Sequence, residues 1–405
     1  MRVLFVHKVF PGQYAHLARS LAAERGNEVV FLHAEGEDEI PGVRKLRIAP
    51  SRSAAAQTHH YVQGLENAVL LGQAAFRAAT DLARSGFRPD VICAHAGFGP
   101  GLYLKDAFPG VALLGYFEWF YRAHDADADF LDPGAVNADE TLRIRTRNAA
   151  LLLELTSCDR GLCPTEFQRQ QFPPELQQKL TVLHDGVDTD YFAPLPTALP
   201  ELPPDAEILT YATRGLEPYR GFPQFMEALA LLQAKRPKLH AVIVGADETH
   251  YGRPAANGRG HREPTLAAIP TLDRARIHFR GFLPAPAYRD VLRASQVHVY
   301  LTVPFVLSWS LLDAMATGCA IVGSDTAPVR EVIRDGRTGL LSDMRSPPAI
   351  ATAIARLLDD RALAARLGLA ARQHVLDGYA LSLLLPQQRA LVASLAAGKA
   401  TRKRA

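Results

Sequence analysis

Two arginines near the middle of the chain lie where proteins commonly bind a phosphate group. Arg214 and Arg220 belong to YATRGLEPYRGF (residues 211–222), which follows an apolar run and precedes a helical pattern. Arginine is always charged and presents a planar fork to phosphate oxygens, and a helix N-terminus adds N–H donors. The pair suits a diphosphate, although the spacing also fits two solvated surface arginines. No GxxxxGK[ST] pattern occurs, which disfavours a P-loop ATPase.

A second segment, YLTVPFVLSWSLLDAMATG (residues 300–318), combines a strand end, a proline and a helix start. We expect Ser308 or Ser310 to cap the helix, so that backbone N–H groups up to Leu311 and Leu312 are available to a phosphate oxygen. Asp313 follows one turn into the helix, where its carboxylate can accept two hydroxyl groups of a ribose. A carboxylate near a helix start also compensates the helix dipole, and this alternative stays open.

Three loops in the first half carry further candidates. Gly12 follows the first apolar run, and its small size either lets backbone approach a ligand or simply makes the turn. His95 ends another apolar run, and Glu118 lies among aromatic residues in GYFEWFYR (residues 115–122). A carboxylate beside aromatic rings suits a sugar, whose C–H faces stack while its hydroxyls form hydrogen bonds. The alternative for both His95 and Glu118 is a place in an aromatic core.

In both halves of the sequence, short apolar runs alternate with longer amphipathic stretches. These elements must position the candidate residues. Continuous apolar runs flanked by helices indicate parallel strands that are buried on both faces. In such open α/β sheets, ligands bind beyond the carboxyl ends of the strands. The expected strands span residues 3–6, 28–32, 91–95, 111–117, 161–165, 208–213, 240–246, 277–282, 297–302 and 320–324.

A proline-rich segment separates the two halves. Residues 193–205, APLPTALPELPPD, contain five prolines and little helical periodicity, which is typical of a linker. The sequence therefore predicts two Rossmann-like doubly wound domains, residues 1–195 and 196–379, facing a central cleft. A helix over about residues 380–396 is expected to pack back on the first domain.

Composition excludes several classes of protein. Lys and Arg number 45 against 42 Asp and Glu, a net charge of +3, which is too small to predict nucleic-acid binding. Four cysteines are too few for a disulfide scaffold. The N-terminus lacks a signal-peptide pattern, and the uncharged run 294–312 contains Pro304 and polar residues, so we expect a cytoplasmic protein. The basic tail, residues 399–405, leaves peripheral contact with the inner membrane face open; the oligomeric state is not predicted.

At these residues the chain resembles the retaining glycosyltransferases of family 4, which have the GT-B architecture. The resemblance covers nearly the whole length and is carried by HDGVDTDYF, TRGLEPYRGF, VIVGADETHYG, HFRGFLP and PFVLSWSLLDAMATGCAIVGSDTAPVREVI in the expected order. The chain looks like a subgroup in which FPGQ, YFEWFYR and PFVLSWSLL replace the motifs that are commoner in the family.

The resemblance implies roles for several of the candidates. Arg214 and Arg220 match the cations that hold the donor diphosphate, Gly12 matches a glycine loop near the donor phosphates, and Asp313 matches the second Glu of the family E-x7-E motif, which binds the ribose. Phe305 stands where the first Glu would be. Sugar contacts are therefore expected from the backbone of residues 306–310, including Val306 and Ser308.

By the same resemblance, Glu118 stands where many members have a histidine near the reacting carbon. From their places after strands, His95 and Phe305 are further candidates for contact with the sugar or the acceptor. The catalytic set is then Glu118, Arg214 and Arg220.

The implied reaction is hexosyl or pentosyl transfer from a nucleoside-diphosphate sugar to an acceptor hydroxyl, with retained configuration, in surface glycan, glycolipid or polysaccharide synthesis. No cofactor is expected, and no metal, because the sequence offers no DxD-type pair in a plausible loop. The acceptor, whether glycan, lipid-linked or small molecule, is expected to contact loops near residues 50–66 and 122–140. The alternatives are a non-catalytic GT-B module that binds a nucleotide or glycan, a nucleotide-sugar epimerase and a phosphorylase.

Overall fold

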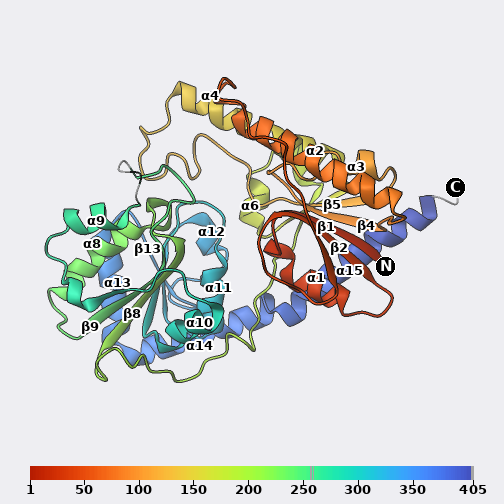
Figure 1. Cartoon of the computed structure of the whole chain (residues 1–405). Coiled ribbons are helices and arrows are strands. Elements are labelled where there is room, and N and C mark those ends of the chain that lie inside the picture. Colours follow the sequence, from red (N-terminus) through yellow and green to blue (C-terminus); the bar gives the residue numbers. More distant parts are fainter. Residues whose placement is uncertain (256–257, 259, 403–405) are drawn as a thin grey trace. The chain divides into compact units, whose positions relative to one another are not determined.

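The chain forms two compact units, each built on a parallel β-sheet (Figure 1). The computed structural model describes residues 1–255, 258 and 260–402. Unit 1 comprises residues 1–123, 134–185 and the C-terminal stretch from Ser382, and unit 2 comprises residues 124–133 and 186–381. Every strand pair in both sheets is parallel, which confirms the predicted α/β class.

The division between the units differs from the expected boundary at residues 195 and 196. The chain enters unit 2 at Gly186, because the Val187 N–H donates to the Tyr379 carbonyl and the Leu381 N–H to the Val187 carbonyl. The proline-rich segment is not a free linker: Leu202 and Ala206 are buried in a cluster on the unit 2 sheet. Hydrophobic burial thus assigns this segment to unit 2.

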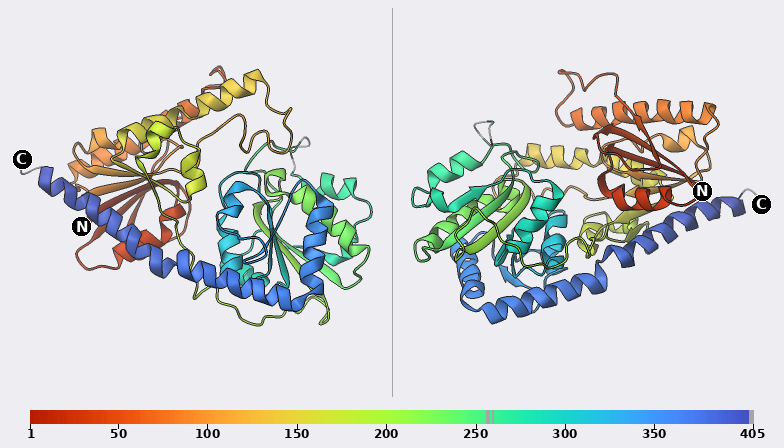
Figure 2. Two further views of the ribbon diagram at one scale, coloured as in Figure 1. Left: turned by 180° about the vertical axis from the view of Figure 1, so that it is seen from behind. Right: turned by 60° about the horizontal axis from the view of Figure 1, so that its bottom comes forward.

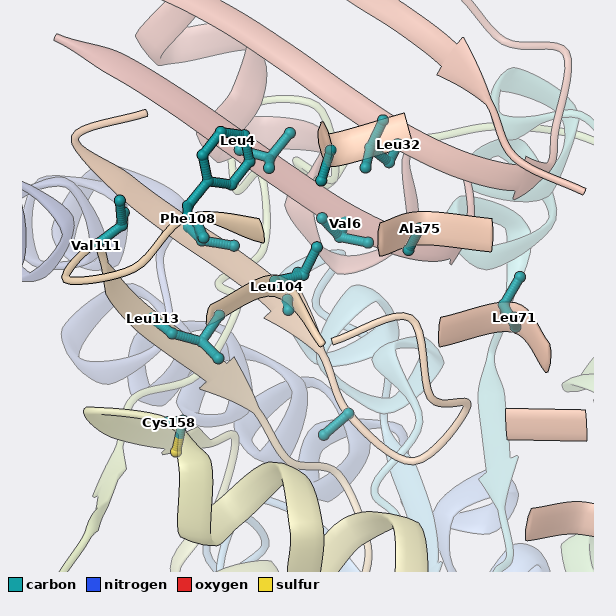
Figure 3. Close-up of a cluster of buried hydrophobic side chains, with 14 of the residues drawn as sticks. Leu4, Val6, Leu32, Leu71, Ala75, Leu104, Phe108, Val111, Leu113 and Cys158 are labelled. Atoms are coloured by element: carbon teal, nitrogen blue, oxygen red, sulfur yellow. The ribbon is translucent and has the colours of Figure 1, made fainter. Parts of the chain in front are cut away.

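The sheet of unit 1 has seven strands in the order β3-β2-β1-β4-β5-β6-β7. Side chains alternate between its faces along β1: Leu4 and Val6 belong to one buried cluster, Val3 and Phe5 to the other. Figure 3 shows part of the first cluster, with Leu4 and Val6 among the labelled side chains. The strands are β1 (Arg2–Val9), β2 (Glu28–Glu35), β3 (Val43–Arg47), β4 (Val91–His95), β5 (Ala112–Tyr116), β6 (Arg160–Cys163) and β7 (Leu180–Val182).

Helices cover both faces of this sheet, as a doubly wound fold requires. The C-terminal helix α15 (Leu381–Arg402) runs beside α1 (Figure 2). Val392 of α15 is fully buried in the same cluster as Val3 and Phe5. The other helices are α1 (Ala15–Ala22), α2 (Gln63–Arg84), α3 (Leu104–Ala107), α4 (Ala138–Arg147), α5 (Ala149–Ser157), α6 (Glu166–Gln170) and α7 (Pro174–Gln177), with a 3-10 turn η1 (Gly12–Tyr14) before α1.

The sheet of unit 2 has six strands in the order β10-β9-β8-β11-β12-β13. They are β8 (Glu207–Gly215), β9 (Leu239–Ala246), β10 (Ile277–Phe279), β11 (Val297–Tyr300), β12 (Ile321–Ser324) and β13 (Leu340–Ser342). Its helices are α8 (Phe222–Gln233), α9 (Arg262–Ala268), α10 (Ala285–Ala294), α11 (Trp309–Ala316), α12 (Ala327–Arg330), α13 (Pro347–Asp359) and α14 (Arg361–Gly378), with 3-10 turns η2 (Pro218–Arg220) and η3 (Arg274–Arg276).

Strand order places the candidate residues at the carboxyl ends of the strands in each sheet. In unit 1 the order changes direction between β1 and β4, and in unit 2 between β8 and β11, which are the points where open sheets bind ligands. In the part of the chain that the structure describes, no helix is both long enough and apolar enough to cross a lipid bilayer.

Candidate active site

In unit 2, Arg220 is a buried cation that ties two loops together. Its side chain is only 6% exposed, and Nη1 donates to Thr302 Oγ1 at 2.9 Å and to the Val306 carbonyl at 3.1 Å. Its own carbonyl accepts a hydrogen bond from the Tyr211 hydroxyl at 2.6 Å. The reading of Arg220 as a solvated surface arginine is therefore wrong: its charge lies against the loop between β11 and α11.

The start of α11 presents backbone donors beside this arginine. Ser308 caps the helix, with Oγ accepting from the Ser310 N–H at 3.4 Å, and its own N–H donates to the Tyr300 hydroxyl at 2.8 Å. Burial raises the pKa of Tyr300, and the Arg220 charge opposes that rise. The Leu311 N–H donates to the Ser308 carbonyl at 3.3 Å. Phosphate binding by the amides of Leu311 and Leu312 stays a prediction. A phosphate would have to share the Leu311 N–H with the Ser308 carbonyl.

Asp313 lies one turn into α11, half-buried beside Tyr288 of α10. The Tyr288 hydroxyl donates to Asp313 Oδ2 at 3.3 Å. Burial raises the pKa of the carboxyl to about 7, and the Tyr288 bond acts in the opposite direction. An acid that is partly protonated near neutrality compensates a helix dipole poorly, which weakens that alternative. Tyr288 is a neighbour that the sequence analysis missed.

Phe305 occupies an aromatic cluster with Tyr219 and Tyr251, at ring-centroid distances of 5.8 and 4.9 Å. The Arg220 guanidinium carbon lies 5.8 Å from the Phe305 ring centre and 5.3 Å from that of Tyr251. Phe305 is 5% exposed, so little of its ring can touch a sugar. The Val306 carbonyl already accepts from Arg220, which leaves backbone N–H groups as the route by which this loop could contact a sugar.

Glu217, which the sequence analysis missed, holds the loop after β9 against these residues. Its Oε2 accepts from the N–H groups of His250 at 2.6 Å and Tyr251 at 2.9 Å. Burial raises the pKa of this carboxyl, while the two backbone bonds and the charges of Arg220 and Arg214 oppose the rise. The sequence signal for Glu217 is a carboxylate between two arginines, Arg214 and Arg220, ahead of a helix. Arg214 itself is exposed. Burial, together with the Arg214 charge, lowers the pKa of His250.

In unit 1, the loops after β1, β4 and β5 converge on Glu118. The Gln13 amide donates to Glu118 Oε1 at 2.5 Å, and His95 Nε2 lies 3.3 Å from Glu118 Oε2. His95 is buried, whereas the Glu118 side chain is 29% exposed. Glu118 is thus a partly accessible carboxylate held by two polar partners, and Gln13 is a member of the group that the sequence did not reveal.

Gly12 lies next to His7 at the carboxyl end of β1. Its φ is +52°, and a Cβ atom built on it would lie 2.8 Å from Cε1 and Nε2 of His7. The Val9 N–H donates to His7 Nδ1 at 2.8 Å, and burial together with the neighbouring His95 lowers the His7 pKa well below its usual value. The histidine is therefore neutral. Close packing on His7 explains why this position is glycine, and contact with donor phosphates stays a prediction.

The structure thus gathers the predicted residues into two groups, one in each unit. Arg214, Arg220, Ser308, Asp313 and the 305–306 loop lie in unit 2; Gly12, His95 and Glu118 lie in unit 1. Among the described residues, no three His, Cys, Asp or Glu side chains are arranged to hold a metal ion.

Two protein-family models match the chain one after the other. Glycosyl transferase family 4 group matches residues 25–192, and glycosyl transferases group 1 matches residues 200–374, so together they cover most of the sequence. These two matches, each over less than half of the chain, support a glycosyltransferase similar to family 4. The subgroup suggested by YFEWFYR and PFVLSWSLL stays a prediction.

Curated relatives include two enzymes with different names. The D-inositol 3-phosphate glycosyltransferase of Streptomyces scabiei is 28% identical over 88% of this chain and 80% of that protein. The glycogen synthase of Mycobacterium tuberculosis is 25% identical over 94% of this chain and 91% of that protein. For the Thermobispora bispora inositol phosphate enzyme, 28% identical, the match spans about half of each protein, 50% and 47%.

Solved structures share the fold over almost the whole length. Sucrose-phosphate synthase from Thermosynechococcus elongatus has a TM-score of 0.75 at 19% identity, with 98% of this chain and 100% of that chain covered. The Anabaena protein HepE in complex with UDP-glucose has a TM-score of 0.68 at 14% identity, covering 97% and 100%. These likenesses, with the two parallel sheets, confirm the GT-B fold.

Proposed function

We propose that this protein is a retaining glycosyltransferase, which moves a hexosyl or pentosyl group from a nucleoside-diphosphate sugar to an acceptor hydroxyl. In this reaction the bond between C1 of the sugar and the diphosphate oxygen breaks. The acceptor oxygen bonds to C1 on the same face, and its proton passes to the departing diphosphate. The two family-model matches and the charged groups at the carboxyl edges of the two sheets support the proposal.

The observation that carries the proposal is the buried Arg220 beside the capped start of α11. Negative charge grows on the diphosphate as the C1–O bond breaks. Fixed N–H donors and a cation already oriented by their surroundings stabilise such charge without further reorganisation. Arg214 is exposed near the same loops and is available to a second phosphate oxygen. Asp313, one turn further along α11, would accept the ribose hydroxyls.

The unit 1 group would act on the sugar and the acceptor. Glu118 is held by Gln13 and His95, so its carboxylate is positioned before substrate arrives. We assign it an orienting role toward a hydroxyl, since the diphosphate itself takes the acceptor proton. The acceptor classes to test first are ring polyols, because one relative is named for D-inositol 3-phosphate and another for glycogen. The same proposal includes a cytoplasmic setting and no need for a metal.

One observation favours a second candidate, a non-catalytic module that binds a nucleotide. The position expected to supply a sugar-binding carboxylate is Phe305, whose ring is buried in packing. Such a module would bind a nucleoside diphosphate as well as its sugar conjugate. It would transfer nothing.

The test is a thermal-shift panel of UDP, GDP, ADP, TDP and their common sugar conjugates, with and without magnesium, followed by transfer assays with the best donor. A ligand at 100 times its Kd raises the stability of the native state by about 2.7 kcal/mol. We expect one base to give a clear shift without magnesium, and Arg214→Ala to weaken that nucleotide more than tenfold. Arg337→Ala, an exposed arginine of unit 2, is the matched control and should bind normally.

Normal binding by Arg214→Ala would show that the phosphate assignment of Arg214 is wrong. No shift with any nucleotide would contradict the proposed function itself. Nucleotide binding without transfer to any acceptor would favour the second candidate.

A further inference from the structure

Near-parallel rings run from the interior of unit 1 to its surface. His95 stacks with Tyr116 at a centroid distance of 5.4 Å and an interplanar angle of 25°, and with Phe98 at 5.6 Å and 20°. Tyr116 and His95 are 4% and 2% exposed, whereas Phe98 is 47% exposed. The stack therefore ends on an aromatic ring that meets solvent, directly beside the histidine that contacts Glu118.

The loop that carries Phe98 is fixed rather than free. Glu154 of α5 accepts the Gly97 N–H at 2.6 Å and the Gly101 N–H at 3.2 Å. Gly99, at a φ of +90°, lies so close to α2 that a Cβ atom there would be 2.2 Å from the Ala68 carbonyl oxygen. A large apolar side chain on a loose loop could fold inward, but here both neighbours of Phe98 are held by other elements. The exposure of its ring is thus imposed by the fold.

The polar groups around this ring indicate the kind of ligand. The Lys8 ammonium lies 5.6 Å from the Phe98 ring centre and 3.2 Å from Glu35 Oε1. An apolar face bordered by a cation and carboxylates matches a polyol ring, which has C–H groups on its face and hydroxyls at its rim. A purely apolar ligand would leave these polar groups unused.

We propose that Phe98 is the stacking platform of the acceptor site and holds a carbohydrate or cyclitol ring beside Glu118. This inference rests on the proposed function, since it assigns the ring to the acceptor. The ring face packs on Phe98, and hydroxyls at its rim reach toward Lys8 and Glu118. Phe98 touches substrate without taking part in bond making, so it determines acceptor affinity rather than chemistry.

The experiment measures binding without catalysis. Ligand-detected saturation-transfer NMR is recorded on the full chain, without donor, using maltotetraose and D-inositol 3-phosphate as probes. We expect at least one probe to bind and Phe98→Ala to weaken its Kd about tenfold. Phe98→Trp, which keeps an aromatic face, should retain binding. Leu153→Ala removes another exposed apolar side chain of unit 1, 55% exposed, and should leave the Kd unchanged.

Equal probe binding by wild type and Phe98→Ala, or no binding of either probe by wild type, would overturn the platform. So would a Phe98-dependent association with phosphatidylglycerol vesicles in the absence of probe binding, because Phe98 would then contact lipid. Nucleotide thermal shifts and transfer assays together separate this failure from failure of the proposed function. If only the platform is wrong, wild type and Phe98→Ala both bind the donor nucleotide and both transfer its sugar. If the function is wrong, both proteins lack either the nucleotide shift or the transfer.

Discussion

Buried carboxyl groups at the carboxyl edges of both sheets use their oxygens to accept backbone N–H groups. Glu217 accepts two N–H groups of the loop after β9, and Glu154 accepts two N–H groups of the loop after β4. A buried carboxyl left without such bonds would be strongly destabilising, so each pair of bonds fixes a loop while lowering the cost of burial. These two residues therefore hold loops next to the candidate site residues.

Glu118 differs from these two because part of its side chain is exposed, and it is the residue whose charge we expect to matter in the reaction. Glu118→Gln keeps the size of the side chain and one acceptor oxygen but removes the charge. We expect kcat to fall at least about tenfold while the donor Kd changes less than about twofold, measured by steady-state kinetics and calorimetry. Glu175→Gln, at an exposed site of unit 1, should have no effect. Unchanged turnover would mean that Glu118 only packs among the aromatic residues of unit 1.

Glu154 gives the molecule a defined pH dependence of stability. Burial raises the pKa of its carboxyl to about 8, despite the two backbone hydrogen bonds. The folded state therefore holds a proton that the unfolded state releases near pH 4.5, and stability falls as pH rises from 4.5 to about 8, by at most about 1.4 kcal/mol per pH unit. Glu154→Gln should flatten this slope in denaturant unfolding measured between pH 5 and 8.

The control for this slope is Glu166→Gln. The neighbouring Arg169 lowers the pKa of Glu166, so its titration affects stability only at acid pH. That variant should shift the whole curve without changing its slope above pH 5. Equal slopes for wild type and Glu154→Gln would mean that Glu154 is ionised in the folded protein.

Among the elements, the strand-to-helix loop at the carboxyl end of β4 approaches its neighbouring helices closely. Gly99 shows the constraint best, because the main chain of α2 occupies the space that a side chain would need. Gly86, which follows α2, has the same φ of +90°, but a Cβ atom added there would meet no other atom within 4 Å. Comparing substitutions at the two glycines therefore separates the cost of the backbone conformation from the cost of a steric clash.

We expect Gly86→Ala to lower the free energy of unfolding by about 1 kcal/mol, because an L-residue at positive φ is strained. Gly99→Ala should cost about 3 kcal/mol or more, since the strain is joined by a clash with the Ala68 carbonyl. Chemical denaturation of both variants measures the difference. Equal losses would mean that the loop moves away from α2 easily, which would also weaken the case for Phe98 as a fixed platform.

On the scale of the whole molecule, the end of the chain returns to the unit in which the chain begins. Val392 of α15 is fully buried with residues of β1, and Arg389 donates to Ser20 Oγ of α1 at 2.8 Å and pairs with Glu24. Unit 1 is therefore incomplete until the last helix has been made. Its core depends on residues more than three hundred positions apart in the sequence.

Val392→Ala should reduce the stability of unit 1 by about 2 kcal/mol, because it removes two methyl groups and leaves a cavity. Differential scanning calorimetry with and without the donor nucleotide assigns the transitions, since ligand binding stabilises only the unit that holds it. Ser394→Ala, at an exposed position of the same helix, is the control. A loss confined to the nucleotide-sensitive transition would contradict the place of α15 in unit 1.

The sequence by itself determined the two parallel sheets, because continuous apolar runs between amphipathic stretches are local patterns. It missed β3, β7 and β13, which are short or charged edge strands: β3 reads VRKLR, and β7 and β13 have three residues each. It also singled out the carboxyl ends of strands and the loops after them, where Gly12, His95, Glu118, Arg214 and Arg220 lie. For these, residue type and position after a strand were enough.

Only the tertiary structure decided which of these side chains are buried and what they contact. The sequence is also compatible with Arg220 as a surface arginine, whereas in the structure its guanidinium donates to Thr302 and to the Val306 carbonyl. Gly12 is explained by His7, and the roles of Glu154 and Glu217 depend on N–H groups of distant loops. Residues 124–133 and the C-terminal helix belong to units that their neighbours in sequence do not share. Hydrogen bonding and burial join residues far apart in the chain, and a local pattern holds no record of such partners.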